Sequence, residues 1–160
     1  MIAHRHTLEA LFEGAPRFLD RLEAAGPFET DQALFEQARS IAHAMPEDEQ
    51  IELVDAHPRL GAPPGTVSAM SYTEQGYDRG TGTPVDVAVE LERGNAAYEA
   101  RFGFRYCVFV AGRSRAALLP DFAATLRDDV DRGVELHRAL DAVVDIAIDR
   151  HAKVSAEAHP

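Results

Sequence analysis

The sequence contains very little sulfur and no long apolar run. Its 160 residues include one cysteine, Cys107, which excludes an intrachain disulfide and a multi-cysteine zinc or iron–sulfur site. Cys107 lies in the apolar run Tyr106–Val110 and is expected to be a small buried side chain. No run approaches the ~18 apolar residues of a membrane span, and the N-terminal residues lack the apolar core of a secretory signal. We therefore expect a cytoplasmic protein without a membrane partner.

Positive charge is also scarce. The chain has 16 lysines and arginines against 27 aspartates and glutamates, which gives a formal net charge of -11. Such a field repels polyanions, and no basic patch is evident, so we expect no nucleic-acid partner. A small anionic ligand would need one or two specific arginines.

The common metal and cofactor motifs are missing as well. The histidines show no HExxH pattern and no other two-histidine spacing backed by an acid cluster, so we expect no metal site. No phosphate-binding loop, dinucleotide fingerprint or GxSxG nucleophile elbow is present. We therefore expect a protein without a bound cofactor.

Most of the chain has the period of amphipathic helices. Two short helices flank the breaker Gly14–Pro16. Pro46 suits the first turn of a helix that should stop by His57, because Pro58 pushes the residue before it away from helical dihedrals. Further helices are predicted over 31–44, along the stripe Ala88, Leu91, Asn95, Tyr98 and Phe102, over 113–127 and over 131–151.

One long segment, residues 58–83, lacks this period and is rich in glycine and proline. Irregular segments of this length in small domains are often functional. Residues Phe104–Val110 are aromatic and β-branched and are expected to be extended. We predict an all-α fold, a single compact domain over residues 1–160 with about seven to nine helices and one long irregular active-site loop.

His57 is the first candidate for chemistry. The C-terminal end of a helix favours an imidazolium, and a protonated histidine there suits a proton donor near neutral pH. The same position is also typical of a structural histidine that only bonds the last helical carbonyls. Position alone favours this structural role.

The segment Ser71–Gln75 has two interpretations. Ser-x-x-Glu is a helix capping box, but Gly76 and Gly80 follow closely and leave little helix to cap. On a glycine-flanked loop, the same side chains would supply one carboxylate and several hydrogen-bonding groups. The residues alone leave both interpretations open.

Arg150 is the third candidate. It continues, at helical spacing, the apolar stripe of Leu136, Leu140, Val143 and Ala147, so it is aimed toward the buried side of the last helix. A buried arginine needs an anionic partner. The alternative is a last-turn cation that complements the helix dipole, with its stem directed outward.

Several motifs, taken in order, resemble those of one family. They are Phe12–Pro16, Ala56–Gly61, Ser71-x-x-Glu74-Gln75, Asn95-x-x-Tyr98, Arg101–Phe104 and the ending that runs from Arg127 through Glu135 to Arg150. Their order and spacing resemble the 2-oxo-4-hydroxy-4-carboxy-5-ureidoimidazoline (OHCU) decarboxylases of purine catabolism, over nearly the whole chain. The resemblance implies an all-helical, commonly dimeric enzyme. It also implies cofactor-independent decarboxylation of the anionic OHCU to (S)-allantoin.

The resemblance also assigns roles to individual residues. His57 matches the catalytic histidine of the family and Glu74 its catalytic carboxylate. The implied substrate-binding residues are Pro58, Ser71, Tyr72, Thr73, Glu74, Gln75, the backbone of Tyr106, Cys107, Val108, Phe109 and Val110, and Arg150.

The sequence departs from the family pattern at a few positions. Gly76–Gly80 stands where an Ala-Gly-Leu run is usual, Arg17 where tryptophan is frequent, and Val130 where asparagine is expected. The first departure adjoins the implied substrate loop. Two alternatives therefore stay open: a cofactor-free enzyme acting on a related ureide or carboxylated heterocycle, and a non-catalytic helical binding module that retains the pocket.

Overall fold

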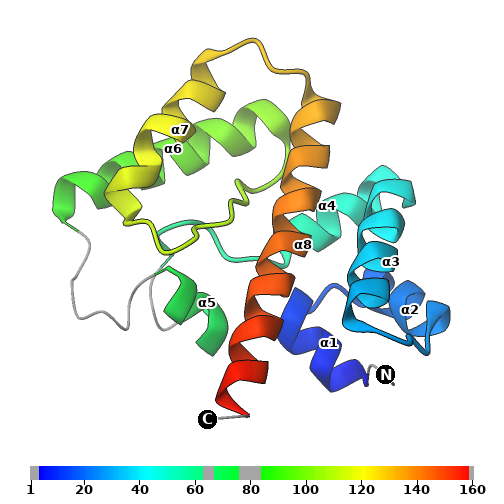
Figure 1. The fold of residues 1–160 in the computed structure, drawn as a ribbon. Helices are drawn as coiled ribbons and strands as arrows, with labels where there is room; N and C mark the ends of the chain where they lie inside the picture. The colour runs from blue at the N-terminus through cyan, green and yellow to red at the C-terminus, as the bar shows by residue number, and fades with distance from the viewer. Residues whose placement is uncertain (1–3, 63–66, 76–83, 159–160) are drawn as a thin grey trace. The chain divides into compact units, whose positions relative to one another are not determined.

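The computed structural model of the protein describes residues 4–62, 67–75 and 84–158. Within these ranges it contains eight helices and no strand (Figure 1). The helices are α1 (Arg5–Phe12), α2 (Pro16–Ala25), α3 (Asp31–Ala44), α4 (Glu47–Asp55), α5 (Ala69–Glu74), α6 (Val85–Phe102), α7 (Arg115–Arg127) and α8 (Arg132–Glu157). This architecture confirms the all-α class and the number of helices expected from the sequence.

The chain divides into two compact units. The first consists of residues 1–56 and 136–160 and contains α1 to α4 and most of α8. The second consists of residues 57–135 and contains α5, α6 and α7. His57 and Glu74 both belong to the second unit, so the two implied catalytic residues lie in one compact body.

Local signals fix where the helices begin and end. The Thr30 side chain accepts a hydrogen bond of 3.1 Å from the Ala33 amide and caps α3. Pro16 is the first residue of α2, where its missing N–H costs nothing. Gly103 ends α6 with a left-handed φ of 80°, which glycine adopts without strain.

Phenylalanine rings join the helices of the first unit. Phe12 of α1 meets Phe18 of α2 edge to face, with 5.0 Å between ring centroids, and lies 6.5 Å from Phe35 of α3. All three rings are buried. Burial of a ring of this kind contributes about 1.5–3 kcal/mol, so these contacts are a main source of stability in this unit.

Charged pairs join α2 to α4 at the surface. Arg17 donates to Asp48 at 2.6 Å and to Glu52 at 2.7 Å. Its hydrogen bond to Asp48 holds the pKa of that carboxyl below the usual value. Arg17 stands where the family pattern frequently has tryptophan, so an arginine with two carboxylate partners replaces an aromatic side chain here.

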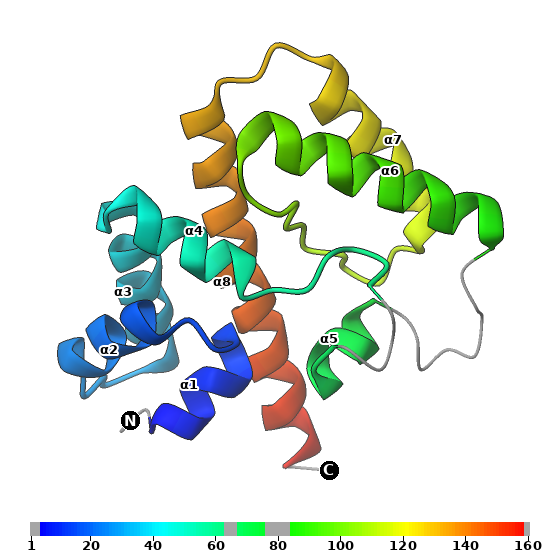
Figure 2. The ribbon, with the colours of Figure 1, turned by 180° about the vertical axis from the view of Figure 1, so that it is seen from behind.

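In the second unit, α6 and α7 lie side by side in both views (Figures 1 and 2). A Cβ atom at Gly94 would lie 2.8 Å from a ring carbon of Phe122, so only glycine permits this close approach. Phe122 in turn stacks on Tyr106, with 4.1 Å between centroids and 7° between planes. The stack holds the segment after α6 against α7.

A buried hydrogen bond links α6 to the start of α8. The Tyr98 hydroxyl donates to Glu135 Oε1 at 2.6 Å, and both side chains are almost fully inaccessible to solvent. A buried carboxylate without such a donor is costly. Tyr98 also contacts the rings of Phe102 and Phe104, so one side chain joins the polar link to the aromatic core.

Two expectations about local structure need correction. The predicted irregular stretch 58–83 contains α5 within its described part, because the Ser68 side chain accepts from the Ser71 amide and caps a short helix. On α6, Ala88 is exposed and Val87 takes its place on the buried stripe. Residues 105–110 form neither a helix nor a strand.

No helix in the described ranges combines the length and the apolar character that crossing a bilayer requires.

The Tyr98–Glu135 hydrogen bond gives a first prediction. Tyr98→Phe should lower the free energy of unfolding by about 1.5–3 kcal/mol, because it removes a hydrogen bond to a buried charged acceptor. Urea denaturation measures this change. Glu135→Gln, which keeps an acceptor for the hydroxyl, should cost less. An unchanged unfolding midpoint in Tyr98→Phe would show that the bond contributes nothing.

Candidate active site

His57 lies directly after α4, in the position expected from the sequence. The helix ends at Asp55, and Ala56 caps it. The His57 side chain is buried, with 4% of the residue exposed. Its carbonyl oxygen accepts a hydrogen bond of 3.2 Å from Arg105 Nη1. Arg105 precedes the segment Tyr106–Val110, so two of the implied site motifs are connected at this point.

A tight turn follows His57 and Pro58. The Ala62 amide donates to the Arg59 carbonyl at 3.0 Å, and Gly61 has a left-handed φ of 80°. A Cβ atom at Gly61 would lie 2.9 Å from Leu91 Cδ1 of α6. Gly61 therefore meets two demands, the left-handed backbone and the close approach of α6, that other residues would strain.

Gln75 connects this turn to the end of α5. Its Oε1 accepts from the Gly61 amide at 2.7 Å, and its Nε2 donates to the Arg59 carbonyl at 3.1 Å. The Gln75 backbone oxygen accepts from Arg115 Nη1 of α7 at 2.7 Å. Both side-chain groups of Gln75 thus bond to backbone. The residue holds the His57 turn and the Glu74 helix together.

Asn95 holds the same turn from α6. It is 3% exposed, and its Nδ2 donates to the Leu60 carbonyl at 3.0 Å. Asn95, Arg105 and Arg115 make positioning contacts that the sequence did not predict. For Asn95 a signal existed, because a polar side chain on the buried stripe of a helix needs a specific partner.

The implied substrate loop Ser71–Gln75 is mostly helix α5. Ser68 caps it, so the capping-box interpretation of Ser71 is wrong. Ser71 is 2% exposed and Glu74 is half-buried, whereas Tyr72 and Thr73 lie on the exposed side. Tyr72 and Thr73 therefore face solvent, whereas Ser71 and Gln75 are buried and Glu74 is partly buried.

The segment Tyr106–Val110 presents backbone of two kinds. The carbonyl oxygens of Phe109 and Val110 accept hydrogen bonds from Arg113 side-chain nitrogens, at 2.9 Å and 3.0 Å. Tyr106 and Cys107 are buried, as expected for Cys107. Within the described chain, the N–H and the carbonyl of the half-buried Val108 make no hydrogen bond.

Arg150 belongs to the first unit, where it is buried with an anionic partner. It is 1% exposed, and Nη2 lies 3.0 Å from Glu13 Oε1. Nη1 donates to the carbonyls of Ala10 and Leu11 at the end of α1, at 3.0 Å and 3.3 Å. The expectation that Arg150 faces the buried side and requires an anion is confirmed. These contacts give it a structural role that the sequence did not suggest.

The second unit therefore places a buried histidine, a half-buried carboxylate and the backbone groups of Val108 within one framework. Proton transfer needs an acid and a base of this kind held in fixed positions. Among the described residues, no group of three or more His, Cys, Asp or Glu side chains is arranged to hold a metal ion. The altered segment Gly76–Gly80 lies outside the described residues.

Comparison with known proteins relates the sequence to one family. The sequence profile described as OHCU decarboxylase matches residues 3–152. The uric acid degradation bifunctional protein PucL of Bacillus subtilis (strain 168) is 30% identical over 152 residues, which cover 94% of this chain and 30% of that protein. The uric acid degradation bifunctional protein of Bacillus sp. (strain TB-90) is 24% identical over 152 residues, covering 95% and 30%. The chain thus spans less than a third of the length of these curated relatives.

Solved structures share the fold. A crystal structure of OHCU decarboxylase in the presence of (S)-allantoin superposes with a TM-score of 0.74 at 25% identity, covering 94% of this chain and 97% of that one. A crystal structure of (S)-allantoin synthase gives a TM-score of 0.67 at 18% identity, covering 93% and 49%. The second likeness shows the fold alone.

The contacts of Gln75 give a second prediction. Gln75→Leu should lower the free energy of unfolding by about 1–3 kcal/mol, because the Gly61 amide and the Arg59 carbonyl lose their side-chain partner. It should also speed hydrogen exchange at the Gly61 amide, which NMR measures. Thr73→Ala, an exposed change on the same helix, should stay within about 0.5 kcal/mol. Unchanged exchange at Gly61 in Gln75→Leu would contradict the assignment.

Proposed function

Because the chain belongs to the OHCU decarboxylase family, we propose that it catalyses cofactor-independent decarboxylation of OHCU to (S)-allantoin, as a carboxy-lyase of urate degradation. The observation that carries the proposal is the pair of Gln75 hydrogen bonds to Arg59 and Gly61. They join the His57 turn to the helix that ends at Glu74, which are the two motifs assigned catalytic roles. The curated relatives, which contribute the context of urate degradation, are longer proteins.

The substrate supplies its own electron sink in this reaction. OHCU has a hydroxyl and a carboxylate on C4, next to a C5=N imine. When the bond from C4 to the carboxylate breaks, its electron pair forms a C4=C5 bond and the imine pair moves to nitrogen. That nitrogen takes up a proton, and loss of the hydroxyl proton with protonation of C5 then gives allantoin, CO2 having left. A pyridoxal or thiamine group, which acts as an electron sink elsewhere, is not required by this chemistry.

Two residues are proposed to move the protons. The Glu74 carboxylate orients the C4 hydroxyl and accepts its proton. His57, in its imidazolium form, delivers a proton to one face of C5, which sets the (S) configuration. Their fixed positions matter because protonation from solvent would reach both faces. Proton transfer by a positioned side chain typically contributes about 10²–10⁴-fold in rate.

Substrate binding is proposed to use the further residues that the family resemblance implies. The N–H and carbonyl groups of Val108, within the segment Tyr106–Val110, are proposed to bond the ring of the ligand. Pro58 follows His57 and is partly buried, and Ser71 lies three residues before Glu74 and is buried. Arg150 is proposed to hold an anionic or carbonyl edge of the substrate. In a chain of net charge -11, an anionic substrate needs such a cation.

Assembly and location belong to the same proposal. We expect a single domain over residues 1–160, a homodimer, and a cytoplasmic protein, all as the family resemblance and the composition imply. Light scattering coupled to size-exclusion chromatography tests the dimer, and one cooperative unfolding transition by calorimetry tests the single domain.

A kinetic prediction tests the two catalytic roles. His57→Gln and Glu74→Gln should each lower kcat by about 10²–10⁴-fold and change KM much less, because they remove proton transfer and keep the shape of the site. OHCU is generated freshly from urate with urate oxidase and hydroxyisourate hydrolase. Circular dichroism then follows the appearance of (S)-allantoin.

Glu92→Gln, the same chemical change at an exposed position of α6, is the matched control and should retain full activity. The proposed function would be refuted if folded wild-type protein did not accelerate OHCU decay above its spontaneous, racemic rate. Unchanged kcat in both variants would refute the catalytic roles of His57 and Glu74 but not the proposed reaction.

A further prediction separates the two roles of Arg150. Arg150→Gln should lower the free energy of unfolding by about 3–5 kcal/mol, since it leaves the Glu13 carboxylate without the buried guanidinium. Arg150→Lys keeps the charge and should fold, but lysine lacks the planar fork that binds carboxylates at two points, so KM should rise. A folded Arg150→Lys variant with wild-type KM would restrict this arginine to its structural role.

A further inference from the structure

Outside the candidate active site, the first unit brings together two histidines that are 94 residues apart in the chain. His43 lies near the end of α3 and His137 on α8. Their Nδ1 atoms are 3.2 Å apart, with the ring centroids at 4.6 Å and the planes at 85°. Two imidazole nitrogens at this distance must share either a proton or a cation, because two lone pairs, or two N–H groups, would repel each other.

We propose that His43 and His137 form a two-histidine binding site for a divalent transition-metal ion such as Zn²⁺, Ni²⁺ or Cu²⁺. Imidazole nitrogen is a preferred ligand of all three ions. Two nitrogens bound to one tetrahedral zinc at about 2.0–2.1 Å lie roughly 3.3–3.4 Å apart, which the observed 3.2 Å nearly matches. The site would therefore need little rearrangement to accept the ion.

An outer carboxylate fixes the tautomer of His43. Asp141 Oδ1 lies 2.8 Å from His43 Nε2, so Nε2 carries the proton and donates it to Asp141. His43 Nδ1 is then left with its lone pair directed at His137. A carboxylate bonded to the far nitrogen of a histidine is the usual second partner of metal-binding histidines, and it raises the basicity of the ligand.

The surrounding charge favours a cation. Arg39 donates to Asp141 at 2.6 Å and to Asp145 at 2.8 Å, so two carboxylates face one guanidinium beside the histidines. Two carboxylates against one guanidinium give this cluster an excess of acidic side chains beside the histidines.

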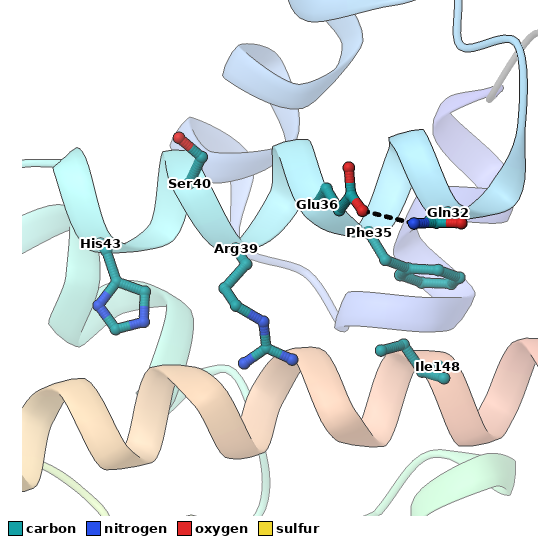
Figure 3. Close-up of a pocket in the computed structure, with 7 residues that line it drawn as sticks. All are labelled: Gln32, Phe35, Glu36, Arg39, Ser40, His43 and Ile148. Atoms are coloured by element: carbon teal, nitrogen blue, oxygen red, sulfur yellow. Dashed lines mark hydrogen bonds between the residues drawn. The ribbon is translucent and has the colours of Figure 1, made fainter.

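Solvent and ions can reach the site. His43 lines a pocket of about 550 Å³ on the first unit, together with Phe35 and Arg39 of α3 and Ile148 of α8. Figure 3 shows the His43 and Arg39 side chains extending from α3 toward α8, on the same side of the helix as Phe35. His137 is exposed. Two protein ligands leave the remaining positions of the ion to water, which this open surface supplies.

Metal binding to untagged protein tests the proposal. Because the ion would join α3 to α8 only in the folded chain, a saturating concentration of Zn²⁺ or Ni²⁺ should raise Tm by roughly 3–8 °C, and EDTA should reverse the rise. Mg²⁺, which prefers oxygen ligands, should have no effect.

Two variants and a matched control locate the effect. His43→Gln and His137→Ala should each abolish the metal-dependent rise in Tm. His151→Gln changes another histidine of α8 that faces a carboxylate of α3, Asp31 at 3.6 Å, and should keep the rise. In wild-type protein, the electron paramagnetic resonance spectrum of one equivalent of Cu²⁺ should show coupling to two imidazole nitrogens.

Three results would overturn the proposal. The site would be refuted if none of the three ions raised Tm, or if the rise persisted in both variants. A Cu²⁺ spectrum with a single nitrogen ligand would also refute it. The spectrum is recorded on wild-type protein, so it decides the matter even where a variant does not fold. None of these readouts depends on decarboxylase activity.

Discussion

The described part of the second unit depends on the hydrogen bonds that side chains make to the backbone of the turn after His57. Arg105 holds the His57 carbonyl, Gln75 holds the groups of Arg59 and Gly61, and Asn95 holds the Leu60 carbonyl. These donors and acceptors come from three separate parts of the chain. A turn without regular secondary structure has no ladder or helical bonds to satisfy its peptide groups, so such side chains must do so. Their placement, in turn, requires α5, α6 and the segment after α6 to be where they are.

The aromatic core gives these contacts a rigid base. Tyr106 stacks on Phe122, and Tyr98 packs against both while its hydroxyl bonds Glu135. The stack fixes the direction in which the chain leaves α6, and so it also sets where the backbone of Val108 lies. The aromatic contacts and the polar contacts of this unit therefore both fix the position of the segment Tyr106–Val110. Chemistry that depends on sub-ångström positions benefits from support of both kinds.

Much of the fold follows from periodicity, and much of the site does not. The stripe from Leu91 to Phe102, the stop before Pro58 and the inward direction of Arg150 are all local properties, and the structure confirms them. Helix α5 was missed because its cap, Ser68, precedes the Ser71 that matches a capping box, and six residues are too few to show a period. The meeting of Gln75 with Gly61, and that of His43 with His137, depend on tertiary contacts between distant residues. The resemblance to a family implies a substrate-binding role for Gln75 but not that Gln75 bonds to backbone.

The contacts that hold the His57 turn have a consequence for how this surface can change over evolution. Gln75 and Asn95 recognise peptide groups, which every residue type has, and not the side chains of Arg59 and Leu60. The Arg59 side chain points outward to an ion pair with Glu99. Replacing it would therefore alter the chemistry presented beside the histidine while the path of the chain stayed the same. Shape and selectivity are separable here: the framework can be inherited intact while the residues displayed on it diverge toward other ligands.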